Sequence, residues 1–115
     1  YQRSIPVTCR LVRLSDVIDE ARVDRIDLLK VDVEGAEFDV MAGIESRHWP
    51  LVRQAIVEVH EGPDACRRME AILAGQGFVT TCWQQAPEIF PRHWLVYARR
   101  PSSGVSPTVP QEQEP

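Results

Sequence analysis

The run IDLLKVDV at residues 26–33 constrains the fold of this chain more than any other segment. It is compact, apolar and rich in β-branched residues, which is typical of a buried strand in a parallel sheet. Glu34 and Gly35 end the run, and residues 36–42 then show apolar positions at helical spacing. A second buried-strand pattern, QAIVEVH, follows at residues 54–60. Strands separated by helices predict right-handed βαβ units.

The flanking segments extend this order to β-α-β-α-β-α-β-β. Ser15 stands where a residue would cap the first helix, and Gly43 where a left-handed residue would end the second. The expected elements are strands at residues 8–14, 26–33, 54–60, 78–83 and 94–98, and helices at residues 16–21, 36–42 and 63–75. The last two strands have no helix between them and predict a hairpin. The predicted fold class is therefore α/β, with a mostly parallel sheet that ends in an antiparallel hairpin.

Composition excludes several classes of protein. The 115 residues suit one domain, and 13 Lys and Arg against 17 Asp and Glu leave no basic field for nucleic acid or an anionic membrane. The apolar stretches are far shorter than the ~20 residues of a membrane span, and no secretory leader opens the chain. Cys9, Cys66 and Cys82 form no CxxC pair, which predicts free thiols in a reducing cytoplasm.

The two ends of the chain carry expectations of their own. Residues 101–115 hold four of the nine prolines and no aromatic residue, which predicts a disordered tail behind a domain of residues 1–100. The first residue is Tyr1 rather than Met, so we expect a processed chain or a piece of a longer one.

Candidate chemistry gathers where the two long strands end, because ligands of doubly wound sheets bind outside the carboxyl ends of the strands. Residues two apart share a face, so Lys30 points with Asp32 and Glu58 with His60. If the strands are neighbours, these four side chains converge. A lysine within an apolar strand needs a partner, and Glu58 is the expected one for Lys30.

Each of these residues also has a purely structural interpretation. Lys30 and Glu58 could form a structural ion pair, and Asp32 could cap the helix that follows. His60 beside Glu58 and Glu61 suits a metal ligand, a general base or a hydrogen-bonded loop histidine. Two further histidines, His48 and His93, follow no pattern and are expected on the surface. The aromatic residues near the hairpin suit either an acceptor pocket or core packing: Trp83, Phe90 and Trp94.

Motifs for phosphate, dinucleotide, acyl-transfer and zinc-protease chemistry are absent from the sequence: GxGxxG, the Walker lysine loop, GxSxG and HExxH. The segment IDLLKVDVEGAE at residues 26–37, in contrast, resembles the FkbM-type family of S-adenosylmethionine-dependent methyltransferases, whose signature has the form iDlLKiDvEGaE. The flanking Leu14-Ser15-Asp16 and Glu58-Val59-His60 also match the family in order and spacing, so the resemblance covers about residues 8–98.

The resemblance implies a Rossmann-like class I methyltransferase that transfers a methyl group from S-adenosylmethionine to a hydroxyl of a natural product, sugar or lipid. By position, Asp32 and Glu34 would lie beside the cofactor, and Asp32 and His60 would be catalytic. Metal-assisted relatives of the fold place a divalent cation where Asp32, Glu58 and His60 stand here. Without a metal, His60 or Asp32 would serve as the general base.

The resemblance covers only the second half of such an enzyme, because the glycine-rich first strand that holds the cofactor has no counterpart in this sequence. The expectation is therefore a C-terminal fragment, or a chain that pairs with a missing N-terminal half or a partner chain. On its own, it should not bind S-adenosylmethionine. A non-catalytic remnant or interaction module of the same fold is the main alternative, and a flavodoxin-like binding module is the other.

Overall fold

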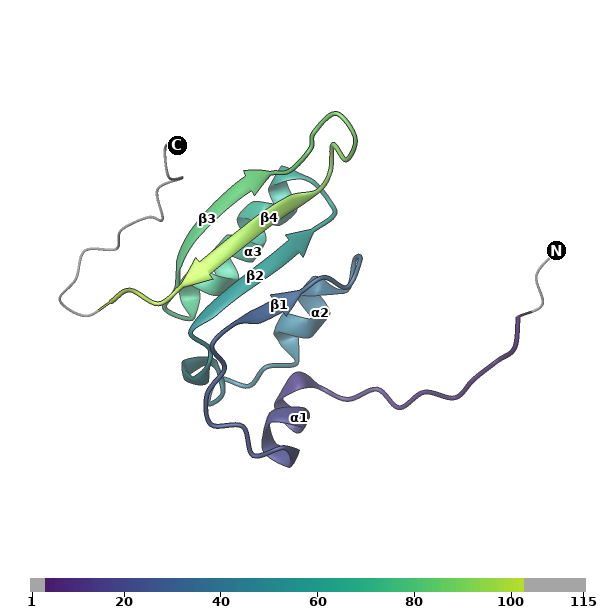
Figure 1. Ribbon diagram of the computed structural model, residues 1–115, viewed down its shortest axis with the longest axis vertical. Coiled ribbons are helices and arrows are strands. Elements are labelled where there is room, and N and C mark those ends of the chain that lie inside the picture. The colour runs from purple at the N-terminus through teal and green to yellow at the C-terminus, as the bar shows by residue number, and fades with distance from the viewer. Residues whose placement is uncertain (1–3, 103–115) are drawn as a thin grey trace, which may run out of the picture.

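A four-stranded sheet in the order β1-β2-β4-β3 organises the chain (Figure 1). The computed structural model describes residues 4–102. The predicted tail from residue 103 onward lies outside the described residues. The elements are α1 (Leu14–Glu20), β1 (Leu29–Val31), α2 (Glu37–Ala42), the 3-10 helix η1 (Trp49–Leu51), β2 (Gln54–Val59), α3 (Pro63–Gly75), β3 (Val79–Gln84) and β4 (Trp94–Arg99).

The sheet is mixed, and the expectation of a mostly parallel sheet is wrong. β1 pairs with β2 in parallel, whereas β4 is antiparallel to both of its neighbours, β2 and β3. The predicted hairpin of β3 and β4 is confirmed, and its second strand lies between β2 and β3. Because β4 makes two of the pairings, a single reversed strand makes most of this sheet antiparallel.

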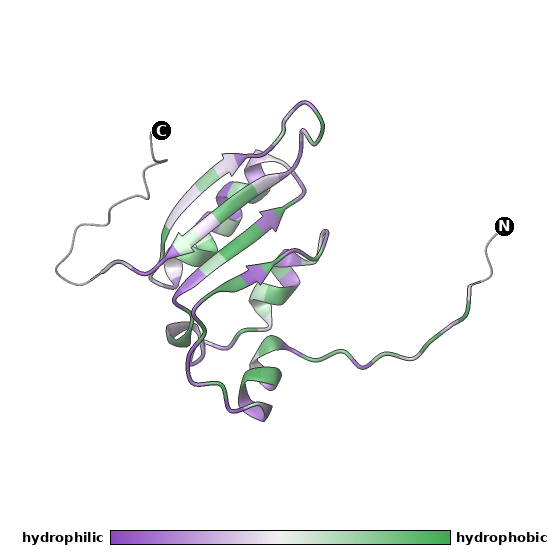
Figure 2. Cartoon of the chain, in the orientation of Figure 1, coloured by the Kyte–Doolittle hydropathy of each residue, from purple (hydrophilic) through white to green (hydrophobic). Residues whose placement is uncertain are grey.

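The helices α2 and α3 cover one face of the sheet (Figure 1). Inward-facing residues alternate along the central strand β2, where Ala55, Val57 and Val59 are fully buried. Met69 and Leu73 of α3 belong to the same core. Figure 2 shows hydrophobic residues along the central strands β2 and β4. None of the helices within residues 4–102 combines the length and apolarity that crossing a bilayer demands.

The opposite face of the sheet has no helix over it in the part of the chain that the structure describes. Lys30 on β1 and Thr81 and Trp83 on β3 are exposed there, and Ile56 on β2 is half-buried. The apolar run at residues 26–33 is therefore buried on one face only. Its regular strand, β1, is shorter than predicted, and an isolated parallel bridge between Ile26 and Val52 precedes β1.

The segment before α1 differs from the prediction. Residues 4–13 are exposed and form no strand, since no described segment pairs with them. Ser15 does not cap α1: it is fully buried, and its Oγ accepts a hydrogen bond from the backbone N–H of Glu45 at 2.7 Å. Arg13 occupies the N-cap, and its backbone N–H donates to the carboxylate of Asp16.

Gly43 ends α2 as expected, but with φ of −85° rather than in the left-handed region. A side chain there would lie 3.4 Å from Cβ of Arg13, so the glycine permits the close approach of the segment before α1. A glycine with positive φ does follow α3, at Gly77.

His48, expected on the surface, is only 4% exposed. Its Nε2 lies 2.9 Å from a carboxylate oxygen of Asp19, and its Nδ1 lies 2.7 Å from Oγ of Ser15. Nη1 of Arg47 lies 3.0 Å from the same Nε2, so this nitrogen contacts both an acceptor and a donor. This chain of hydrogen bonds ties α1 to the loop before η1.

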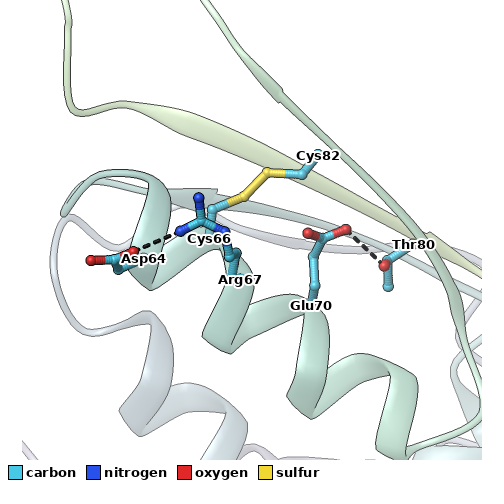
Figure 3. Close-up of a disulfide and its surroundings, with 6 residues drawn as sticks. All are labelled: Asp64, Cys66, Arg67, Glu70, Thr80 and Cys82. Carbon is cyan, nitrogen blue, oxygen red and sulfur yellow. Dashed lines mark hydrogen bonds and ion pairs between the residues drawn. A yellow bond between two sulfur atoms is a disulfide. The ribbon is translucent and has the colours of Figure 1, made fainter.

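The cysteines also differ from the prediction of three free thiols. Cys66 of α3 and Cys82 of β3 form a disulfide, which links the helix to the outer strand of the sheet (Figure 3). A hydrogen bond of 2.9 Å from Thr80 to Glu70 joins the same two elements. Cys9 is free and exposed.

Candidate functional site

A cavity of about 450 Å³ opens where β1 and β2 end. Its volume is within the range of small-molecule sites, and its position is where α/β sheets bind ligands. The cavity is lined by Asp32, Glu34, Glu58, His60, Gln85, Ala86, Phe90 and His93.

Three of the four side chains that were expected to converge, Asp32, Glu58 and His60, meet at this cavity. The parallel register pairs Val31 with Val57, so the following positions on the two strands bring Asp32 and Glu58 to one edge. Nε2 of His60 lies 3.4 Å from Oε1 of Glu58 and 3.9 Å from Oδ1 of Asp32. Glu34, the other residue expected near a cofactor, is exposed on the lining of the same cavity. Their roles stay predictions.

Lys30 does not join this group, and its expected ion pair with Glu58 is wrong. Lys30 is exposed and lies opposite Ile56 in the register, one pair before the end of β1. With no helix over this face among the described residues, the lysine does not have to be buried. The carboxylate of Glu58 faces the histidines instead.

Glu37, the first residue of α2, holds His60, although sequence reasoning assigned it no role in the site. Its side chain is buried, and Oε1 lies 2.6 Å from Nδ1 of His60. Its two carboxylate oxygens also accept from the backbone N–H of Gly35, each at 3.1 Å. The turn that allows this has positive φ at Glu34 and Gly35, so that α2 begins with Glu37 pointing back toward β2.

The charge of Glu37 determines which ring nitrogen of neutral His60 carries the proton. Burial disfavours the charged form, but hydrogen bonds from the backbone N–H groups of Gly35 and Glu37 and from His60 outweigh it and hold the pKa of Glu37 below its usual range. An ionised carboxylate can only accept, so Nδ1 of His60 carries the proton and donates it to this bond. The lone pair of neutral His60 is therefore on Nε2, which faces Glu58 and Asp32.

His93 is the second residue that sequence reasoning missed. The antiparallel register pairs Glu58 with Leu95 and Val59 with Trp94, so the next step places His60 opposite His93. The two rings meet edge to face at 4.5 Å between centroids, and Nδ1 of His93 lies 3.6 Å from Oε1 of Glu58.

The loop between β3 and β4 supports this position. Phe90 stacks on the ring of His93 at 4.9 Å, and the backbone N–H of His93 donates to the carbonyl of Phe90. In the sequence, His93 stands directly before the last strand of the hairpin. This position points to the site only when that strand is known to pair with β2. Of the three aromatic residues near the hairpin, Phe90 lines the cavity and Trp94 packs against the core, whereas Trp83 is exposed.

The arrangement supports proton transfer at a hydroxyl. A buried carboxylate orients an imidazole, and the free nitrogen of that imidazole faces a solvent-accessible cavity with two further carboxylates. This is the geometry of a positioned general base. The negative charge of the carboxylates also favours the binding of a cation in the cavity.

Comparisons with known proteins identify the family. Residues 1–80 match the family model described as the methyltransferase FkbM domain. The chain is 46% identical over 74 residues to the 31-O-demethyl-FK506 methyltransferase FkbM of Streptomyces tacrolimicus, an alignment that covers 64% of this chain and 28% of that protein. It is 44% identical over 86 residues to the methyltransferase sdnD of Sordaria araneosa, covering 68% of this chain and 33% of that protein.

A further relative, the AMB antimetabolite synthetase AmbE of Pseudomonas aeruginosa, is 39% identical over 103 residues, which cover 85% of this chain and 5% of the synthetase. The chain thus spans about a third or less of the length of these relatives. No solved structure matches. Because the family model covers more than half of the sequence, the chain belongs to the FkbM methyltransferase family.

Proposed function

We propose that this chain is the acceptor-side part of an S-adenosylmethionine-dependent O-methyltransferase that acts on a hydroxyl of a natural product, sugar or lipid. Family membership supports methyl transfer. The name of the Streptomyces relative, a 31-O-demethyl-FK506 methyltransferase, supports oxygen as the methylated atom.

The observation that carries the proposal is the hydrogen bond between Glu37 and His60, which lines the cavity. A hydroxyl must lose its proton as it attacks the methyl carbon, and a base positioned within reach accelerates that step. Nε2 of His60 is the free nitrogen, and Glu37 stabilises the imidazolium that forms when it takes up the proton.

The carboxylates at the end of β1 fit the cofactor. S-adenosylmethionine carries a sulfonium and an ammonium group, and Asp32 and Glu34 offer exposed carboxylates on the same cavity as His60. When bound, the cofactor supplies an electrophilic methyl group. Asp32, at 3.9 Å from Nε2 of His60, would help to hold the acceptor hydroxyl beside the base. Alignment of this kind supplies much of the rate of a direct displacement.

In the proposal, the remainder of the cofactor site comes from sequence outside this chain, because the matching segments cover only 28% and 33% of the two relatives. The open edge of β1 is where it would join. Within residues 4–102, β1 has a single neighbour, β2, and the apolar residues near its free edge are exposed, with Leu28 at 49% and Val33 at 42%. A paired strand would cover this edge.

The test is methyl transfer by the full-length gene product that contains this chain. Radiolabelled S-adenosylmethionine and 31-O-demethyl-FK506 serve as the first donor and acceptor, followed by hydroxyl-bearing sugars and lipids. We expect His60→Gln to lower kcat by about 10²- to 10⁴-fold, the contribution of a general base. The control is Asp39→Asn, a change of an exposed aspartate on α2 outside the cavity.

Two results would contradict the proposal. A full-length protein that does not bind S-adenosylmethionine in calorimetry supports a non-catalytic member of the family. Near-normal turnover in His60→Gln, with a loss in Asp32→Ala alone, would move the proton acceptor from His60 to Asp32.

A further inference from the structure

We propose that Glu58, His60 and His93 form a binding site for a divalent transition-metal ion. This set differs from the Asp32, Glu58 and His60 group expected from the sequence, because the loop before β4 supplies a second imidazole. One carboxylate and two imidazoles then face one another at the cavity, and their ligand atoms all lie within 4.8 Å of one another.

Two of the three ligand separations are close to those around a shared ion. Two ligands bound at 2.0–2.1 Å in tetrahedral geometry lie about 3.3 Å apart. Oε1 of Glu58 lies 3.4 Å from Nε2 of His60 and 3.6 Å from Nδ1 of His93. These distances are too long for hydrogen bonds of normal length, and they are close to the spacing of ligands around one ion.

The surroundings of His60 are those of a metal ligand. The second ring N–H of a histidine ligand donates a hydrogen bond to a carboxylate or a carbonyl, which fixes the tautomer and the ring orientation. Nδ1 of His60 makes this bond to the buried Glu37, so that in the neutral ring the lone pair is on Nε2, on the side of Glu58. His93 is also held in place, by the stacked ring of Phe90 and the backbone bond to its carbonyl.

The ligand types select the class of ion. Two imidazoles and a carboxylate suit Zn²⁺, Fe²⁺ or Co²⁺, whereas Mg²⁺ prefers a set of oxygen atoms. Three protein ligands also leave coordination positions open toward the cavity, as in catalytic rather than structural zinc sites.

The use of this ion in catalysis rests on the proposed function, but its binding does not. A metal ion at this position lowers the pKa of a hydroxyl that it binds. Nε2 of His60 would then serve as a ligand, and Asp32 would be the nearest free carboxylate. Metal-bound and metal-free forms of the protein therefore differ in which residue accepts the proton.

The experiment is a titration of the chelator-treated chain with CoCl₂, followed by visible absorption, in a Cys9→Ser background that removes the exposed thiol. Cys66, Glu70 and Cys82 also lie close together, but the two sulfur atoms are bonded to each other, and any binding by reduced thiols would add thiolate charge-transfer absorption in the near ultraviolet. Competition with ZnCl₂ and MgCl₂ then ranks the ions.

We expect one Co²⁺ per chain, displaced by Zn²⁺ and not by a similar concentration of Mg²⁺. His93→Gln should weaken binding at least tenfold, and Glu37→Gln by about 10- to 100-fold through the orientation of His60. The matched control is Glu61→Gln, an exposed carboxylate directly after His60 that does not line the cavity. Circular dichroism confirms that each variant is folded.

Unchanged Co²⁺ affinity in folded His93→Gln would overturn the site, and so would equal affinity for Mg²⁺ and Zn²⁺. The proposed function has a separate readout. Stoichiometric binding that requires His93 supports the site even if the full-length protein transfers no methyl group. Methyl transfer by a protein that binds no metal would overturn the site and leave the proposed function in place.

Discussion

Glu37 and His60 are 23 positions apart in the sequence, yet their side chains lie 2.6 Å apart, between Oε1 and Nδ1. The bond joins the first residue of α2 to the residue directly after β2. It also connects the core to the cavity, because Glu37 is buried and His60 is partly accessible. The same carboxylate therefore contributes to both stability and the state of the site.

Glu37→Gln should destabilise the chain. The carboxylate accepts from Gly35 and His60, and an amide of the same shape replaces one of its acceptor oxygens with a donor. One buried donor then faces another, which costs about 1–3 kcal/mol of the free energy of unfolding. Urea denaturation followed by tryptophan fluorescence measures the change. The control is Glu20→Gln at the exposed end of α1, and an equal midpoint for both variants would show that the bond contributes nothing.

Ser15→Ala should cost about 1–3 kcal/mol of the free energy of unfolding as well, for a different reason. The hydroxyl accepts from the backbone N–H of Glu45 and shares a hydrogen bond with Nδ1 of His48, and both Ser15 and His48 are buried. Alanine leaves both partners unsatisfied. Guanidinium denaturation is the measurement, with Ser46→Ala, an exposed serine, as the control. A loss no larger than that of the control would mean that water replaces the hydroxyl.

Reduction of the disulfide should lower stability. Cys66 and Cys82 are separated by 16 positions, and closing a loop of this length stabilises a fold by about 3 kcal/mol. Alkylation of the unfolded, unreduced chain should label Cys9 alone, and three cysteines after reduction. Labelling of all three cysteines before reduction would show that the disulfide is absent. In that case, Cys66→Ala should unfold at the same urea concentration as the unmodified chain.

Much of the fold could be predicted because local patterns agree with tertiary structure in the second half of the chain. Pro63 begins α3 and the hairpin of β3 and β4 is where the pattern placed it. The strand at residues 8–14 was wrong because a strand is defined by its neighbour, and no described segment pairs with it. The insertion of β4 beside β2 likewise depends on packing that no local pattern encodes.

Only those site residues could be predicted whose positions follow from where a strand ends and which face of it they share. Alternation along the strands was enough to group Asp32, Glu58 and His60. Glu37 could not be identified in this way, because its direction depends on positive φ angles at the two preceding residues. His93 lies 35 positions after Glu58 in the chain, and its place in the site depends on the register of β4, as the pairing of Glu58 with Leu95 shows.

Gly62 and Gly75 should respond in opposite directions to alanine. Gly62 precedes α3 with φ of 89° and ψ of −172°, a conformation that only glycine adopts without strain, although there is room for a Cβ atom. Gly62→Ala should cost about 1–3 kcal/mol. Gly75 lies inside α3 with open space around it, so Gly75→Ala should be neutral or stabilise by about 0.4–1 kcal/mol. Thermal unfolding of both variants tests the pair, and a gain in Gly62→Ala would contradict the strain.

The acid end of the stability profile should depend on Asp19. Hydrogen bonding to Arg47, with a smaller contribution from His48, lowers the pKa of Asp19 from 3.8 to about 2. A carboxyl whose pKa is lower in the folded state stabilises the fold above its unfolded pKa, and this contribution is lost as pH falls through the folded value. The unmodified chain should therefore lose stability between about pH 4 and pH 2 through this group.

Asp19→Asn separates this contribution from general acid denaturation. The asparagine cannot ionise, so the variant should have a lower Tm than the unmodified chain at pH 6, and the difference should narrow as pH falls toward 2. Tm measured from pH 2 to pH 6 in low salt provides the comparison, with Asp24→Asn as a control at an exposed aspartate of the neighbouring loop. Because the pair with Arg47 is half exposed, added salt should reduce the effect. A constant difference in Tm across this range would show that Asp19 acts through packing or neutral hydrogen bonds rather than through its charge.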